Sequence, residues 1–329
     1  MKPSLIRPAL KLLIERQRPA FMWGPPGVGK SDTVAQVAKE LKLELRDIRL
    51  SLMDPTDIKG FPMPSTDNKS MRFLPPNFLP TKGKGLLFFD EMNQAPQAVQ
   101  AATYQLILNR AIGDYKLPDG WAIIAAGNRT TDRSVAHAMP AALANRFVHI
   151  DFDVDMEDWV DWAIANGISD ATRGYIRYRP GNLVVSKIEP GARAFHTPRS
   201  WAFADQIINS GLAPEIEIEL LKGTIGEGVA AEYMGFIRDA KNLPNIDKIL
   251  MDPEGTEVPK SPSTQYALVS ALDSRVGPNN FGILLKYVKR MSKEFEVVFA
   301  SSSVRRDTEI SETKAFTEWA RENRSLLIS

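Results

Sequence analysis

The chain contains no cysteine, and it has only three histidines in 329 residues. The absence of cysteine excludes disulfide bonds, thiolate nucleophiles and cysteine-based zinc sites, and it is compatible with a reducing compartment. His137, His149 and His196 lie far apart in the sequence and form no pair at metal-binding spacing. We interpret His137 as a structural or solvated residue. Chemistry in this protein therefore has to come from other side chains.

Long apolar runs and an excess of charge of either sign are also missing. No stretch reaches the roughly 18 apolar residues of a membrane-spanning helix, and Pro3 and Pro8 interrupt the N-terminal region. The 41 Lys and Arg residues balance 40 Asp and Glu residues, so no overall field attracts nucleic acid or an anionic membrane. We expect a soluble, cytoplasmic protein without membrane insertion, long enough for about two domains.

Short apolar runs alternate with helical patterns in the first half of the chain. Helical spacing covers 30–41 and 96–108. Four runs are predicted to form strands: Ala20–Trp23, Gly85–Phe89, Trp121–Ala126 and Phe147–Ile150. This alternation predicts a doubly wound α/β domain with a parallel sheet covered on both faces.

The second half of the chain has mostly helical apolar spacing. Acidic residues crowd 151–161, which we interpret as a solvated face at a domain boundary, with no assigned chemistry. From Met156 onward the pattern predicts an all-α region. The stretch 241–263 is rich in Pro, Asp and Lys and is expected to be a long connection. Further helices are predicted at about 264–275, 280–290 and 311–323.

A phosphate-binding pattern follows the first predicted strand and opens the first predicted helix. In such a pattern, glycines let backbone N–H groups close around phosphates, a lysine reaches the terminal phosphates, and a hydroxyl binds Mg²⁺. A Gly-Pro turn preceding a lysine by chance is the alternative, which the flanking strand and helix disfavour. The predicted nucleotide-binding residues are Gly24, Pro25, Pro26, Gly27, Val28, Gly29, Lys30, Ser31 and Asp32.

Two adjacent carboxylates follow the second apolar strand. Asp90 and Glu91 are expected at the carboxyl edge of the sheet, where ligands bind in such folds. Asp90 is predicted to hold Mg²⁺ together with Ser31, and Glu91 to orient or deprotonate the attacking water. Acids that end a strand are commonly only solvated, so this interpretation depends on the phosphate-binding pattern.

The third apolar strand ends in a lone amide, Asn128. This side chain is predicted to hydrogen-bond the attacking water or the γ-phosphate. The alternative is a turn residue, because Gly-Asn is a common turn dipeptide.

In this order and spacing, the three motifs resemble the Walker A, Walker B and sensor-1 elements of AAA+ ATPases. Within that superfamily, Asp90–Pro96, Ala144–Phe147 and Gly223–Tyr233 are similar to MoxR-type sequences. The resemblance implies an AAA+ P-loop αβα core with a parallel sheet at 1–152, an all-α lid at 153–240 and a helical C-terminal extension at 241–329.

The resemblance also assigns roles to arginines. Arg146 is expected to be the arginine finger, offered to the ATP of a neighbouring subunit, although Asn145 replaces the more usual acid of the family. Arg129 and Arg133 remain weaker candidates. Arg199 lies just after a capping Thr-Pro pair in the first turn of a predicted helix, which suits a sensor-2 arginine. For Arg146 and Arg199, the alternative is an ordinary exposed arginine.

Two segments correspond to insertions in MoxR-like proteins. The segment 54–80 is too irregular for a core element and is expected near a central pore; alternatively, its apolar side chains pack against the sheet. These side chains are Phe61, Met63, Met71 and Phe73. The segment Ile112–Pro118 is expected to form a hairpin.

The resemblance implies a Mg²⁺-dependent ATPase that forms a ring, expected to be hexameric. Its implied use is chaperone-like remodelling or maturation of a client protein, with a von Willebrand factor A domain protein as an expected partner. One alternative is a nucleic-acid motor that uses basic residues at 82–84 and 286–290. The near-neutral net charge of the chain argues against it. The other is a non-catalytic ATP-binding scaffold, against which Lys30, Asp90, Glu91 and Arg146 argue.

Overall fold

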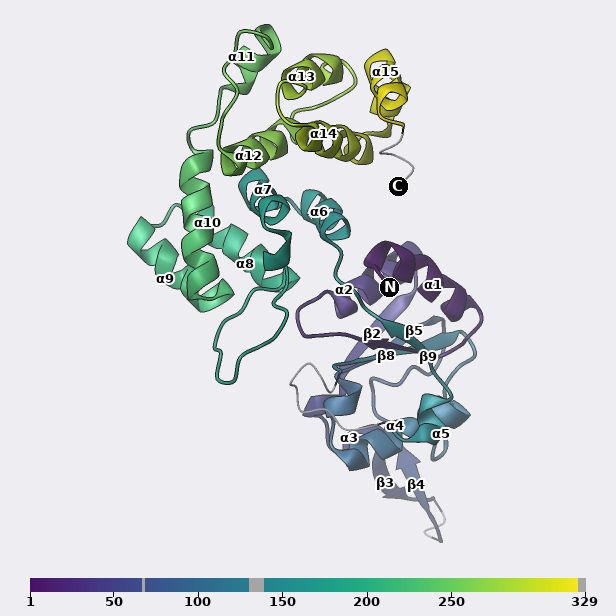
Figure 1. Ribbon diagram of the computed structural model, residues 1–329. Coiled ribbons are helices and arrows are strands. Elements are labelled where there is room, and N and C mark those ends of the chain that lie inside the picture. Colours follow the sequence, from purple (N-terminus) through teal and green to yellow (C-terminus); the bar gives the residue numbers. More distant parts are fainter. Residues whose placement is uncertain (67–68, 130–138, 325–329) are drawn as a thin grey trace. The chain divides into compact units, whose positions relative to one another are not determined.

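The computed structural model describes residues 1–66, 69–129 and 139–324, and it divides the chain into two units, Met1–Asp155 and Met156–Ser329 (Figure 1). Among the residues described, no helix has the length and apolar character needed to cross a bilayer.

The first unit is built on a five-stranded parallel sheet in the order β2-β5-β8-β1-β9. β5 and β8 are buried along their whole length, as their uninterrupted apolar sequences require. The strands are β1 (Ala20–Trp23), β2 (Glu44–Arg49), β5 (Gly85–Asp90), β8 (Trp121–Gly127) and β9 (Val148–Asp151). The predicted α/β fold is confirmed, and its parallel strands place their carboxyl ends along one edge.

Helices cover both faces of this sheet. On one face, Leu87 and Phe89 of β5 pack against α4 (Gln97–Asn109). The alternating residues Leu86 and Phe88 face the opposite side, where α1 (Pro3–Glu15) and α2 (Lys30–Glu40) contact the sheet. Phe88 and Phe89 are fully buried, and each such side chain contributes about 1.5–3 kcal/mol to the free energy of folding. A short helix, α5 (Ala141–Ala144), precedes β9.

The segment 54–80 is more regular than expected. It forms α3 (Pro55–Lys59) and an antiparallel hairpin of β3 (Phe61–Pro64) and β4 (Met71–Leu74). The interpretation in which the hairpin's large apolar side chains pack against the sheet is wrong. Their exposed fractions are 66% for Phe61, 42% for Met63, 65% for Met71 and 40% for Phe73. The predicted hairpin near Ile112 is confirmed as β6 (Ala111–Ile112) paired with β7 (Tyr115–Lys116).

Every regular element described in the second unit is a helix, as predicted. Two helices were not expected: one within the supposed connection 241–263, and one of 14 residues at 293–306. The helices are α6 (Met156–Ala165), α7 (Asp170–Tyr178), α8 (Pro198–Ile208), α9 (Pro214–Ile225), α10 (Glu227–Ala240), α11 (Ile246–Met251), α12 (Pro262–Asp273), α13 (Phe281–Val288), α14 (Lys293–Arg306) and α15 (Lys314–Glu322).

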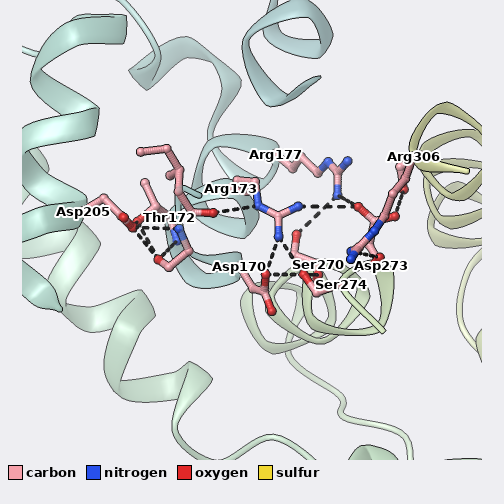
Figure 2. Close-up of polar contacts among 12 residues, drawn as sticks. Asp170, Thr172, Arg173, Arg177, Asp205, Ser270, Asp273, Ser274 and Arg306 are labelled. Atoms are coloured by element: carbon pink, nitrogen blue, oxygen red, sulfur yellow. Dashed lines mark hydrogen bonds and ion pairs between the residues drawn. The ribbon is translucent and has the colours of Figure 1, made fainter. Parts of the chain in front are cut away.

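A buried polar network joins α7 to its neighbours in this unit (Figure 2). On one side of α7, the hydroxyl of Thr172 contacts the carboxylate of Asp205 on α8. On the other side, Asp273 of α12 lies between two guanidinium groups, 3.7 Å from Nη1 of Arg173 and 3.5 Å from Nη1 of Arg177. Burial lowers the pKa of the Arg173 guanidinium, and Asp170 and Asp273 partly offset this effect. The network joins residues before position 240 to residues after it, and both groups belong to one unit. The predicted boundary at 240 between a lid and a C-terminal extension therefore stays a prediction.

Candidate functional site

The loop between β1 and α2 carries the predicted phosphate-binding residues. Gly29 caps α2 at φ +100°, and Gly27 lies at φ +77°, conformations that residues with a Cβ rarely adopt. The N–H of Gly24 donates to the carbonyl of Gly127 at 3.3 Å, which ties the loop to the end of β8. Asp32 is exposed in the first turn of α2, and its predicted contact with nucleotide stays a prediction. The loop thus places the N-terminus of a helix at the carboxyl edge of the sheet, where its free N–H groups can receive an anion.

Lys30 links the loop to Asn128. Its side chain is buried, and Nζ donates to the carbonyl oxygens of Gly24 at 2.6 Å and Pro25 at 2.9 Å. The same ammonium group lies 3.2 Å from Oδ1 of Asn128. The end of β8 therefore reaches the phosphate-binding loop, as the order of the strands requires.

Ser31 and Asp90, the two predicted metal ligands, are in direct contact. Oγ of Ser31 donates to Oδ2 of Asp90 at 2.8 Å, and the other carboxylate oxygen accepts from the backbone N–H of Glu91 at 2.9 Å. A hydroxyl and a carboxylate are hard oxygen ligands of the kind that Mg²⁺ prefers. Among the described residues, no cluster of three or more His, Asp or Glu side chains could hold a metal. This pair therefore fits a cation that takes its remaining ligands from phosphates and water.

Negative charge accumulates at this edge of the sheet. Desolvation raises the pKa of the Asp47 carboxyl on β2, and the charge of Asp90 raises it further, while Arg49 opposes the change. A cation bound beside Asp90 would relieve this repulsion.

Glu91 lies at the turn after β5 with φ +53°, an unusual backbone conformation for a residue other than glycine. Its carboxylate accepts a hydrogen bond from the hydroxyl of Ser51, in the short 3₁₀ segment Leu50–Leu52 after β2. Ser51 was not predicted from the sequence, because β2 before it has the charged sequence of an exposed edge strand and was not predicted either.

Asn93 is the second residue that the sequence analysis missed. Its amide pairs with the backbone of Asn128 at two points: Nδ2 donates to the carbonyl oxygen at 2.7 Å, and Oδ1 accepts from the N–H at 3.2 Å. Only 3% of Asn93 and 8% of Asn128 is exposed. A Cβ on Gly127 would lie 2.1 Å from Oδ1 of Asn93, so this close approach requires glycine there.

The two predicted arginines described in the first unit lie at opposite ends of the sheet: Arg129 follows Asn128 at the carboxyl end, and Arg146 lies at the amino end. Arg146 is exposed and precedes β9, whose register pairs Val148 with Ala20 and Asp151 with Trp23. Arg146 thus lies beyond the amino end of the sheet, whereas the phosphate-binding loop lies beyond its carboxyl end. The paired stretch of β1 and β9 that separates them is about 10 Å long. Arg129 instead pairs with Asp151 at 3.0 Å.

Arg199 is exposed in the first turn of α8, in the second unit. The capping box of Thr197 and Ser200 begins this helix as predicted. Contact between Arg199 and nucleotide stays a prediction. Arg133 and His137 lie outside the described residues.

A comparison with known proteins finds a family model and a relative that match the part of the chain carrying this site. Residues 20–149 match the model of the ATPase family associated with various cellular activities (AAA). Midasin from Giardia intestinalis is 27% identical over 191 residues, which are 55% of this chain but only 4% of midasin.

Solved structures resemble the chain at low identity. The RuvB Holliday junction branch migration motor from Thermotoga maritima is 18% identical with a TM-score of 0.42, over 82% of this chain and 79% of RuvB. NtrX from Brucella abortus is 14% identical with a TM-score of 0.37, over 89% of this chain and 67% of NtrX. Similarity at this level carries no information on function.

Proposed function

We propose that the protein binds ATP with Mg²⁺ and hydrolyses the ATP to ADP and phosphate, a proposal supported by the match of residues 20–149 to the AAA family model. One observation supports this most directly: the ends of three neighbouring strands meet through Lys30 with Asn128 and Ser31 with Asp90. Because these bonds join residues 98 and 59 positions apart, they depend on the fold and not on a local sequence pattern.

The residues present fit both ligands. The loop offers backbone N–H groups and the positive end of α2 to the phosphates, and Lys30 can exchange its carbonyl partners for phosphate oxygens. Ser31 and Asp90 would hold Mg²⁺, which neutralises charge on the terminal phosphates when bound. Glu91 would then accept the proton of the attacking water, with Asn128 orienting that water and Arg199 contacting the γ-phosphate from the helical unit.

The proposal includes assembly into a ring, with six subunits as the expected size. Its support is the place of Arg146 at the amino end of the sheet, opposite the loop of its own subunit. An exposed arginine there can reach only the nucleotide of another copy, where a planar cation would stabilise the transferring phosphoryl group. Such a head-to-tail contact between different surfaces closes into a ring when the rotation permits.

We further propose a MoxR-like role in remodelling or maturing a client protein in the cytoplasm, with a von Willebrand factor A domain protein as the expected partner. The exposed β3–β4 hairpin supports this role, because it presents Phe61 and Met71 at 66% and 65% exposure. Apolar side chains grouped on an exposed hairpin are typical of protein-binding surfaces. The place of this hairpin relative to a pore stays a prediction.

A nucleic-acid motor is less well supported, because the basic cluster near 286–290 already has partners within the chain. Lys286 pairs with Glu254 at 2.5 Å, Lys289 pairs with Glu322 at 2.7 Å, and Arg290 donates to two backbone carbonyls. Lys286, Lys289 and Arg290 would have to exchange these partners for phosphates, and the near-neutral net charge provides no overall attraction to nucleic acid. A non-catalytic scaffold would not require Glu91 beside an intact metal-ligand pair.

The test is ATP hydrolysis per subunit over a range of protein concentrations for the wild type, Glu91→Gln and Arg146→Ala. The activity of the wild type should rise with protein concentration. It should fall about 10²–10⁴-fold in Glu91→Gln and about 10³–10⁵-fold in Arg146→Ala. Both variants should still bind ATP. Arg16→Ala is the matched control, because Arg16 is another exposed arginine of the same unit. Full activity of Arg146→Ala, or a rate independent of concentration, would refute the shared site.

The same assay distinguishes the alternatives. Stimulation by DNA that decreases steeply with salt would support the motor, and ATP binding without turnover would support the scaffold. Stimulation by a co-purifying protein would support the remodelling role.

A further inference from the structure

Asn93 holds the two strand ends that carry the proposed hydrolytic residues. It lies two positions after Glu91 in the 3₁₀ segment Met92–Gln94, on the β5 side of the site. Its amide bonds to both the N–H and the C=O of Asn128, on the β8 side. Two bonds from one planar group to one residue fix both the position and the orientation of that residue, which a single bond would not do.

The burial of this contact adds to its rigidity. Neither residue is more than 8% exposed, so water cannot readily replace the two hydrogen bonds. Gly127 packs directly against the Asn93 amide, and the ring of Phe21 would also contact a Cβ at that position, at 2.9 Å. The close packing on both sides of Gly127 therefore opposes a shift of the Asn128 backbone.

We propose that Asn93 is a positioning residue for ATP hydrolysis: it sets Asn128 and the turn at Glu91 in register with each other without touching the nucleotide. This inference rests on the proposed ATPase function and deepens it. Glu91 and Asn128 come from different strands, and Asn93 is a side chain that bridges their two turns. The Glu91 backbone at φ +53° is unfavourable, so it needs such support from its surroundings.

The phosphate-binding loop has supports of its own. Lys30 is bonded to the loop carbonyls and to the Asn128 side chain, and Ser31 is bonded to Asp90, whereas the Asn93 amide bonds to the Asn128 backbone. Loss of the Asn93 amide should therefore reduce turnover and leave nucleotide binding nearly intact. A displacement of about 1 Å in a catalytic group can cost about 10²-fold in rate.

The experiment compares Asn93→Ala with the wild type and with a matched control, Asn280→Ala. Asn280 also pairs one amide with a backbone N–H, of Gly277 at 2.8 Å, and a backbone C=O, of Arg275 at 3.0 Å, but it lies in the second unit. We expect kcat to fall about 10- to 100-fold in Asn93→Ala. The affinity for a non-hydrolysable ATP analogue should stay within about threefold, and Asn280→Ala should keep its kcat.

Asn93→Asp provides a second readout that a merely structural role would not produce. A carboxylate accepts from the N–H of Asn128 but cannot donate to its C=O, whereas a protonated carboxyl group can. Burial raises the pKa of a carboxyl group, so the ratio of the variant's kcat to that of the wild type should increase as the pH falls from about 8.5 to about 6. The pH dependence of Asn93→Asp can be measured even if Asn93→Ala does not fold.

Each outcome decides between the proposals. A kcat of Asn93→Ala within about threefold of the wild type overturns the positioning role and leaves the ATPase function standing. Equal losses of ATP-analogue binding and kcat, or a flat ratio for Asn93→Asp over that pH range, also overturn it. If the wild type does not hydrolyse ATP at any concentration, the proposed function and this inference both fail.

Discussion

Replacing Asp273 with asparagine should destabilise the helical unit strongly, although the two side chains have nearly the same shape. Asp273 is fully buried, accepts a hydrogen bond from Ser302 at 2.9 Å, and lies between the guanidinium groups of Arg173 and Arg177. Figure 2 shows Arg173 and Arg177 of α7 beside Asp273 of α12. The Asp273→Asn substitution therefore removes little more than the charge that the two arginines face.

The size of the effect follows from burial. The side chains of Arg173 and Arg177 are 4% and 2% exposed, and Nη1 of Arg173 and Nε of Arg177 have no hydrogen-bond acceptor among the described residues. Removing one partner of such a buried pair costs about 3–5 kcal/mol, because the remaining charge stays desolvated. For a unit of this size, 1 kcal/mol shifts Tm by about 2–4 °C, so Tm should fall by about 6–20 °C.

Asp247→Asn is the matched control, because it removes the same charge from an exposed pair. Asp247 lies 2.7 Å from Arg275, with side chains 57% and 51% exposed. Exposed pairs contribute about 0–1 kcal/mol, so calorimetry of the full chain should show a much smaller shift. If the two variants shift Tm equally, or if Asp273→Asn costs less than about 1 kcal/mol, the reasoning from burial is wrong.

Four further outcomes are expected. Lys30→Ala should weaken ATP binding about 10- to 100-fold in titration calorimetry, because a charged hydrogen bond is worth about 1.5–3 kcal/mol; unchanged affinity would contradict its role. Ser51→Ala should raise kcat a few-fold, because Glu91 is no longer held by the Ser51 hydroxyl, and a lower kcat would show that Ser51 supports Glu91 instead. Chelation of Mg²⁺ should abolish hydrolysis reversibly, and activity that persists in EDTA would exclude the Ser31–Asp90 site. Burial lowers the pKa of His196, and a backbone hydrogen bond with Ile225 partly offsets this effect, so the folded state favours the neutral form. Stability should therefore decrease as the pH falls below about 6.5. A Tm that depends on pH equally in the wild type and in His196→Gln would refute this.

Much of the candidate nucleotide site could be predicted because its residues have local sequence signals. The predicted strands at 85–89 and 121–126 are continuous apolar runs, and the candidate functional residue of each is the first polar side chain after it, Asp90 or Asn128. Parallel strands then bring these ends to one edge whatever the details of packing. The loop glycines are equally local, since the left-handed conformations of Gly27 and Gly29 are a property of a few residues.

The segments that were mispredicted lack such local signals. β2 reads Glu-Leu-Arg-Asp-Ile-Arg, whose charges are tolerated only because β2 is the edge of the sheet. The helix at 293–306 contains valines and serines, which have low helix propensity, and packing against α12 and α13 overrides that preference.

The sequence by itself determined the phosphate-binding loop, the strand-end acids and the division into an α/β half and a helical half, because these depend on neighbouring residues and on hydrophobic periodicity. Only the tertiary structure decided that Asn93 meets Asn128, that Ser51 meets Glu91, and that Asp273 is buried between Arg173 and Arg177. These contacts join residues far apart in the chain, so they follow from strand order and helix packing, which no local pattern specifies.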